Sequence, residues 1–118
     1  MAFSAVLSEV YRRALATAEI LRRTGCEVLV ACSGDLLDIP SGYIAARRAG
    51  CAFFVYLFDD YVYQWTNSAQ RWFAGRIARG IMKRTEGVIA PNELLAEEWR
   101  RRYGAKPTIV RNPCESVV

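Results

Sequence analysis

Apolar residues follow two different patterns along the chain, and the two patterns alternate. Long segments repeat them every three or four residues, which predicts helices over about 4–24, 38–49, 67–85 and 92–103. Short continuous apolar runs predict strands at about 27–32, 51–58, 88–90 and 108–110. Helix and strand thus alternate, which predicts a parallel sheet with right-handed crossovers. The inward face predicted for the first helix consists of Phe3, Val6, Leu7, Val10, Ala14, Ala18 and Leu21.

Turn-forming and capping residues stand at the boundaries of these segments. Gly25, Gly50 and Gly104 follow three of the predicted helices, where glycine readily ends a helix. The second, third and fourth predicted helices begin at residues that are suitable N-caps, namely Asp38, then Asn67 or Ser68, and Asn92. The inward face predicted for the third helix consists of Ala69, Phe73, Ile77 and Ile81.

The most apolar run of the chain is the segment 51–58, which ends on the adjacent carboxylates Asp59 and Asp60. A continuous apolar strand of this length indicates cover by helices on both faces. We therefore predict one α/β domain over residues 1–118, Rossmann-like and three-layered (α/β/α), with a parallel sheet of about four strands. The chain length is close to that of one ordinary domain.

Polar residues cluster where three of the predicted strands end. In sheets of this class, ligands bind beyond the carboxyl ends of the strands, so we interpret these clusters as a candidate binding site. Its members are Ser33, Gly34 and Asp35, then Asp59, Asp60 and Tyr61, and finally Asn92 and Glu93. We expect one of the two adjacent aspartates to face the cleft and the other to cap the following loop. The alternative for this pair is that both carboxylates only solubilise a loop.

The amino-acid composition limits the kinds of functional site that the chain can form. The chain has no histidine, and its four cysteines lack a C-x-x-C pair, so we expect no metal site. Serine and cysteine triads would lack their usual base, and neither a P-loop nor a G-x-G-x-x-G motif is present. The absence of these motifs disfavours a stand-alone doubly wound enzyme. Free cysteines beside apolar strands suit a reduced, cytoplasmic protein.

The formal net charge of +4 suits an acidic surface, such as phospholipid headgroups or phosphate-bearing ligands. The segment 61–84 combines aromatic and basic residues, a composition typical of helices that rest on anionic membranes. Its candidate membrane contacts are Trp65, Arg71, Trp72, Arg76, Arg79 and Lys83. The alternative is a core-facing helix with ordinary solvated arginines. No apolar run reaches the roughly 20 residues of a membrane span. We expect a cytoplasmic protein, with a peripheral position at the inner membrane face as the further expectation.

Three short motifs, taken in order, give the chain a family resemblance. They are Phe58-Asp59-Asp60-Tyr61, Ala90-Pro91-Asn92-Glu93 and Val110-Arg111-Asn112-Pro113-Cys114-Glu115. Over about 27–115 the chain resembles the N-terminal domain of glycosyltransferase family 4, the retaining sugar-nucleotide-dependent enzymes of the GT-B fold. In that family a strand commonly ends in His-Asp, the next runs into a polar turn, and the last leads to an Asn-containing turn before the second domain.

The resemblance implies transfer of a sugar from a nucleotide-sugar donor to a glycan or lipid-linked acceptor. The eight residues of the candidate site would then lie on the acceptor-side wall, and the donor would lie on the family's second domain. Phe58 stands where the family has histidine, so no role for an imidazole is implied. The family's opening strand has no counterpart before residue 27. Because the resemblance places the donor on the second domain, we expect no catalytic residue and no cofactor in this chain, and we expect the isolated chain to be inactive.

A second hypothesis comes from another class of protein, a small non-catalytic α/β binding or assembly module. We expect no nucleic-acid partner under either hypothesis. The segment 28–32 contains neither a charge nor a proline, and it would form an exposed apolar edge of the sheet. This feature predicts that the isolated chain forms a homodimer, across this strand or across the first helix.

Overall fold

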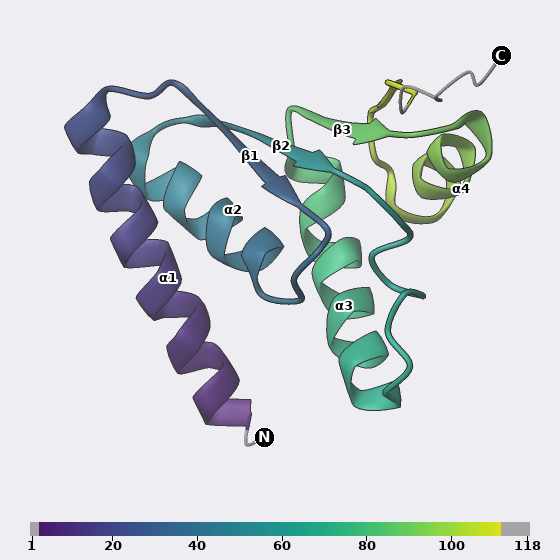
Figure 1. Cartoon of the computed structure of the whole chain (residues 1–118), viewed down its shortest axis with the longest axis horizontal. Helices are drawn as coiled ribbons and strands as arrows, with labels where there is room; N and C mark the ends of the chain where they lie inside the picture. The colour runs from purple at the N-terminus through teal and green to yellow at the C-terminus, as the bar shows by residue number, and fades with distance from the viewer. Residues whose placement is uncertain (1–2, 112–118) are drawn as a thin grey trace, which may run out of the picture.

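Four parallel strands, four α-helices and one 3₁₀ turn make up the part of the chain that the computed structural model describes, residues 3–111 (Figure 1). The α/β class and the four-strand parallel sheet, both predicted from the hydrophobic pattern, are confirmed. In chain order the elements are α1 (Phe3–Thr24), β1 (Val28–Cys32), α2 (Asp38–Ala49), β2 (Ala52–Tyr56), α3 (Ser68–Ile81), η1 (Met82–Arg84), β3 (Gly87–Ala90), α4 (Glu93–Tyr103) and β4 (Pro107–Ile109).

The strands lie in the sheet in the order in which they occur in the chain, β1-β2-β3-β4. Neighbours are parallel, in a register that pairs Val30 with Phe54. Right-handed crossovers that all step in one direction place their helices on the same face of a sheet. Burial along β2 agrees, because Phe53 and Val55 are buried and the alternate residues Phe54 and Tyr56 are half-buried. The described residues thus supply the sheet and one helix layer of the Rossmann-like arrangement.

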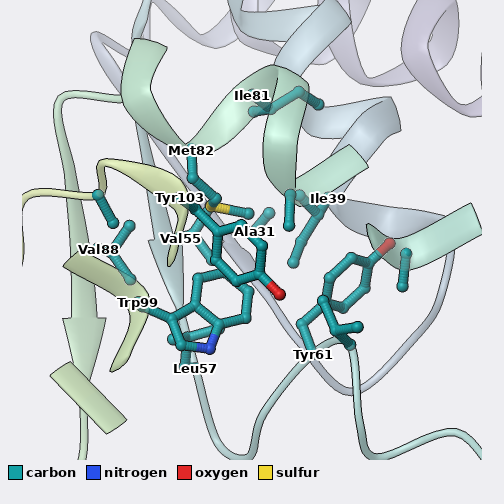
Figure 2. Packing of buried hydrophobic residues seen from close by; sticks show 14 of the residues in the cluster. Ala31, Ile39, Val55, Leu57, Tyr61, Ile81, Met82, Val88, Trp99 and Tyr103 are labelled. Carbon is teal, nitrogen blue, oxygen red and sulfur yellow. The ribbon is translucent and has the colours of Figure 1, made fainter. Parts of the chain in front are cut away.

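The helix-covered face of the sheet forms the core. Val55 of β2 and Val88 of β3 are buried in one cluster with Met82 and Trp99. Figure 2 shows these side chains gathered near Tyr103. The rings of Trp99 and Tyr103 meet edge to face with their centroids 4.7 Å apart. Both rings belong to α4, so this pair stabilises the helix itself by about 0.5–1.5 kcal/mol beyond its buried area. Burial of the two side chains in the cluster with Val55 and Val88 holds α4 against the sheet.

Helix α1 packs alongside α2, as Figure 1 shows. Its buried face consists of Val10, Ala14, Ala18 and Leu21. The prediction for its first two turns was wrong, because Phe3 and Leu7 are exposed. The reason is that α2 begins beside the middle of α1, since Asp38, the first residue of α2, contacts Arg13. Phe3 and Leu7 lie in the turns of α1 before Arg13.

A close approach of α2 to the sheet depends on one glycine. A Cβ atom at Gly42 would lie 3.0 Å from the ring of Phe53 and 3.3 Å from the Cβ of Ala31. Any larger residue at position 42 would therefore push α2 away from β1 and β2. This position explains why α2 carries a glycine in the middle of a helix, where glycine is otherwise unfavourable.

The predicted N-caps and glycine stops are confirmed with one exception. Asn67 and Asn92 each accept backbone hydrogen bonds from the first turn of their own helix, as predicted. Asp38 is not an N-cap, since it lies inside the first turn of α2 and Leu37 occupies the cap position without a side-chain bond. Asp35 satisfies the N–H of Leu37 instead, at 2.8 Å. Positive φ angles at Gly25, Gly50 and Gly104 confirm the three predicted stops.

Helix α3 differs from its prediction in its buried face and in its end. The buried residues are Ala74, Gly75, Ala78 and Ile81. Phe73 and Ile77 are only half-buried and Ala69 is exposed. The small side chains let α3 approach the core closely. The prediction relied on large apolar residues, and it therefore assigned a buried face that is rotated about the helix axis from the observed one. The α-helix ends at Ile81 and the turn η1 follows, so the predicted helix to about residue 85 was too long.

Strand β1 is an edge of the sheet, paired only with β2 among residues 3–111. The carbonyl of Glu27 and the N–H of Ser33 bond to β2. Backbone groups alternate in direction along a strand, so those of Val28, Val30 and Cys32 point away from the sheet. Val28 and Val30 are 51% and 44% exposed. The open apolar edge that the sequence predicted is therefore present.

Candidate functional site

The carboxyl ends of β1 and β2 are joined by Ser33, one of the predicted site residues. Ser33 is fully buried, and its Oγ accepts a hydrogen bond from the N–H of Phe58 at 2.9 Å. Its carbonyl accepts a second bond from the side-chain amide of Gln64 at 2.8 Å. Ser33 therefore fixes the positions of two loops relative to each other. Its hydroxyl faces the interior, and Gly34, the next residue, is exposed.

Asp35 lies in a cluster of charges centred on Arg13. The Arg13 guanidinium contacts Glu9 and Asp35 at 2.8 Å each and Asp38 at 3.0 Å. Hydrogen bonds from Arg12 and Arg13 lower the pKa of Glu9 to about 2. Arg13 therefore binds α1 to the loop between β1 and α2 and to the start of α2. One carboxylate oxygen of Asp35 also accepts the N–H of Leu37 in that loop.

The second predicted group divides into one exposed residue and two that build the following turn. Asp59 is exposed, and its Oδ1 accepts the N–H of Asp60 at 2.9 Å. Asp60 accepts the N–H groups of Val62 and Tyr63 at 3.0 and 3.2 Å. The expectation that one aspartate caps the loop is confirmed for Asp60. Asp59 is the member of the pair that solvent reaches.

Tyr61 is fully buried and lies within the core (Figure 2). Its hydroxyl donates to the carbonyl of Leu36, which closes the loop between β1 and α2 against the turn that follows β2. Burial, with the nearby charges of Asp35 and Asp38, raises the pKa of Tyr61 above its ordinary value. The buried side chain of Tyr61 therefore connects the two loops at this edge of the sheet.

The third group lies at the start of α4. The Asn92 side chain accepts the N–H of Leu95 at 2.8 Å and so caps the helix. Glu93 is exposed and forms an ion pair with Arg111, which lowers the pKa of Glu93. This pair joins the beginning of α4 to the chain just after β4.

The eight predicted residues thus lie along one edge of the sheet, but their side chains do different things. Asp35, Asp59 and Glu93 present carboxylates to solvent, which can accept hydrogen bonds from hydroxyl groups. Ser33, Asp60, Tyr61 and Asn92 use their polar atoms to hold the loops and the helix start. The exposed carboxylates can bind a polar, hydroxyl-bearing ligand at this edge. The other four residues hold the loops and the helix start in position.

Three residues of this edge were not singled out from the sequence as members of the site, namely Arg13, Gln64 and Arg102. Arg13 and Gln64 reach partners in the loop after β1 from other elements. Arg102 of α4 lies over the ring of Tyr63 at 5.1 Å and approaches Asp60 at 3.9 Å. All of these contacts join positions far apart in the chain, and no local pattern indicates them.

The membrane-contact candidates lie just before α3, on α3 and on η1. The exposed candidates are Arg71, Trp72, Arg76, Arg79 and Lys83. The guanidinium of Arg76 lies 5.6 Å from the ring centre of Trp72, which is 58% exposed. Trp65 is different, since it is half-buried against Tyr61 with ring centroids 6.5 Å apart. The carbonyl of Trp65 accepts a bond from Arg71 Nε at 2.6 Å.

Within residues 3–111, no helix is long and apolar enough to cross a bilayer. In the same range, no group of three histidine, cysteine, aspartate or glutamate side chains is placed to hold a metal ion. The Asn112-Pro113 turn of the third resemblance motif lies outside the described residues. Comparisons with protein-family models, with curated proteins and with solved structures each returned no match to this chain.

Proposed function

We propose that the chain is the acceptor-side part of a glycosyltransferase of the family 4 type. It would help to transfer a sugar from a nucleotide-sugar donor to a glycan or lipid-linked acceptor. The donor would be held by a second domain of the kind that this family has. Asp59 is the acceptor contact that we favour, with Asp35 and Glu93 on the same edge of the sheet.

The observation that supports this proposal is the position of the exposed carboxylates. Asp35, Asp59 and Glu93 follow β1, β2 and β3, which are neighbours in a parallel sheet. Parallel strands end at the same edge, so the three acids line one side of the molecule, where α/β proteins bind ligands. Carboxylates that accept hydrogen bonds from sugar hydroxyls suit an acceptor site better than a site for an anionic donor.

The test uses the longest reading frame that contains residues 1–118. The encoded protein is incubated with labelled UDP- and GDP-sugars together with glycan and lipid-linked acceptors. Transfer that depends on Asp59 supports the proposal. A frame that adds no donor-binding domain, combined with the absence of transfer and of nucleotide-sugar binding in calorimetry, refutes it.

One observation favours the second hypothesis, a non-catalytic binding or assembly module. A groove of about 460 Å³ lies over β2, β3 and β4, and its lining includes Phe54, Ile89 and Val110. Apolar sheet surfaces of this kind bind other polypeptides. Stable complex formation without sugar transfer would favour this function over the first.

The proposal also covers location and partners. We place the protein in the cytoplasm, in peripheral contact with the inner membrane face through α3. The basic residues and exposed Trp72 of that helix support this placement. A lipid-linked acceptor would be reached from the same surface.

A further inference from the structure

Helix α3 and the turn η1 carry five basic residues between them. The three arginines of α4 pair with carboxylates of their own helix, and in α1 Arg12 pairs with Glu9 at 2.6 Å. Helix α3 contains no acid, and its basic residues and those of η1 form no ion pair with any residue in 3–111. These residues are Arg71, Arg76, Arg79, Lys83 and Arg84.

The charge count shows how strongly this segment stands out. The chain has 16 lysines and arginines against 12 aspartates and glutamates. Without the five basic residues of α3 and η1, eleven cations face twelve acids, so the rest of the chain is nearly neutral. The segment 68–84 therefore carries five positive charges and no negative charge, whereas the rest of the chain carries a formal charge of −1.

A groove of about 360 Å³ runs along this surface, between α3, the turn after β2 and the end of α4. Two of the unpaired arginines line it, together with aromatic and hydroxyl side chains, and the lining contains no carboxylate. The lining residues are Val62, Tyr63, Ser68, Arg71, Trp72, Gly75, Arg79 and Tyr103. Arg76, by contrast, lies over the ring of Trp72 and is not part of the lining.

The two arginines of the groove are held toward each other by the helix. Arg71, Gly75 and Arg79 follow one another at four-residue steps, so they share one side of α3. A Cβ atom at Gly75 would lie 3.3 and 3.6 Å from the two terminal nitrogens of Arg79. The Arg79 guanidinium therefore lies back over Gly75, in the direction of Arg71.

Arg71 is anchored by its Nε, which donates to the carbonyl of Trp65 at 2.6 Å. This bond orients the guanidinium and leaves its two terminal nitrogens for a ligand. Hydroxyl donors stand beside them, from Ser68 and from Tyr103 on the opposite wall. Burial raises the pKa of Tyr103, and nearby Asp60 and Tyr63 add to this effect, so the Tyr103 hydroxyl stays protonated and can donate.

We propose that this groove binds a phosphate monoester between the guanidinium groups of Arg71 and Arg79. A dianionic phosphate balances two cations, and each guanidinium can donate two parallel hydrogen bonds to its oxygens. Ser68 and Tyr103 supply further donors, and the rings of Tyr63 and Trp72 can contact the organic part of the ester. The phosphate can belong to a lipid headgroup or to a soluble compound. The proposal does not depend on the glycosyltransferase function, and absence of sugar transfer leaves it unaffected.

The first experiment uses inorganic phosphate as the probe, at constant ionic strength set with chloride. The Nε–H signals of Arg71 and Arg79 are followed by nuclear magnetic resonance. The proposal predicts saturable shifts of both signals. Arg79→Gln is expected to weaken binding at least about tenfold, the loss of one charged hydrogen-bonding partner. Arg76→Gln, which removes the same charge from the same helix outside the groove, is expected to change binding less than about twofold.

A third variant tests geometry without changing charge. Gly75→Ala places a methyl group 3.3 Å from a terminal nitrogen of Arg79, so the guanidinium must shift, and alanine is the better helix former. We expect it to weaken phosphate binding several-fold while every cation remains. Equal losses in Arg79→Gln and Arg76→Gln, or unchanged binding in Gly75→Ala together with non-saturable shifts, would show diffuse attraction to the helix and overturn the proposal.

The second experiment separates the two sources of phosphate. Vesicles with phosphatidic acid, a monoester, are compared with vesicles of phosphatidylglycerol, a diester, at equal surface charge, and glucose 6-phosphate is compared with glucose. Preference for phosphatidic acid that Arg79→Gln abolishes supports the groove as a lipid headgroup site. Preference for the sugar phosphate that Arg79→Gln abolishes supports it as a site for a soluble ester. Absence of both preferences contradicts binding of a phosphate monoester.

Discussion

The Oγ atom of Ser33 accepts a hydrogen bond from the backbone N–H of Phe58 at 2.9 Å, and it does so with the Ser33 side chain fully buried. This bond connects the ends of β1 and β2 at the edge that carries the exposed carboxylates. A serine that would be grouped with ligand-binding residues therefore determines the shape of the edge. Replacing it should affect stability before it affects binding.

Ser33→Ala removes the side-chain partner of the Phe58 N–H in a part-buried hydrogen bond, which should lower the free energy of unfolding by about 1–3 kcal/mol. Urea denaturation followed by circular dichroism measures the change. Ser41→Ala is the matched control, because Ser41 is also buried but its Oγ donates to the carbonyl of Leu37 within helical geometry. The control should change stability by less than half as much. Equal effects would mean that the Ser33 bond has no special role.

Asp59→Asn, in the full protein that contains this chain, should weaken acceptor use more than donor binding. The expected loss is roughly 1.5–3 kcal/mol in kcat/KM with acceptor as the varied substrate, from one charge-assisted hydrogen bond. Asp60→Asn is the matched control, because the Asp60 side chain is already occupied by the turn at Val62 and Tyr63. Unchanged acceptor kinetics in Asp59→Asn would remove this residue from the site.

The pKa of Glu9 gives a prediction about acid. Its value of about 2 lies below the ordinary 4.5, so the charged form of Glu9 stabilises the folded state. This contribution is fully present above about pH 4.5 and is lost as the pH falls toward about 2. Glu9→Gln should therefore flatten the decline of stability in that window, as measured by thermal unfolding at several pH values. An NMR titration that places the carboxyl of Glu9 near 4.5 would contradict the ion cluster in solution.

Vesicle binding should be weak and sensitive to salt. Anionic lipid should bring the protein down in co-sedimentation at low salt, neutral lipid should not, and added salt should release it because exposed charges are screened. Trp72→Ala should reduce vesicle binding, because it removes an exposed ring that can contact lipid. Trp65→Ala should remove no lipid contact, since the Trp65 ring packs against Tyr61. Equal sedimentation with both lipids, or with neither, would favour ordinary solvated arginines.

The open edge of β1 predicts self-association of the isolated chain. Sedimentation velocity at micromolar concentration should show a dimer. Val30→Pro removes an N–H that points away from β2, so the sheet within one chain is kept while pairing with another chain is blocked. Val30→Thr keeps that N–H and should remain dimeric. A monomeric parent chain, or a dimer that survives Val30→Pro, would argue against association through this edge.

Much of the architecture follows from local pattern. The repeats of apolar residues predict each helix and strand to within a few positions, and the glycines and asparagines at the helix ends do what their chemistry favours. Local pattern fails where small residues pack. The face of α3 is set by Ala74, Gly75 and Ala78, which carry little apolar surface of their own.

The candidate site is harder to predict in detail, although its place at the sheet edge is readily predicted. Sequence places Asp59, Asp60 and Tyr61 together, but they differ in solvent access, because Tyr61 turns into the core. The partner of Asp35 is Arg13, 22 positions away in the chain. Such a pairing depends on how α1 packs against α2. The pattern of one segment cannot reveal it.

The strand order β1-β2-β3-β4 has a consequence for how the chain folds. Within residues 3–111 each strand pairs only with its neighbours in the chain, so no pairing among these strands has to wait for a distant segment. The molecule can therefore grow by adding one helix-strand unit at a time, somewhat as a repeat protein does. Partial folding from β1 onward should leave compact species, and removal of β4 should weaken the sheet gradually rather than abolish it. A growing chain on the ribosome could begin to assemble this sheet before its last strand has been synthesised.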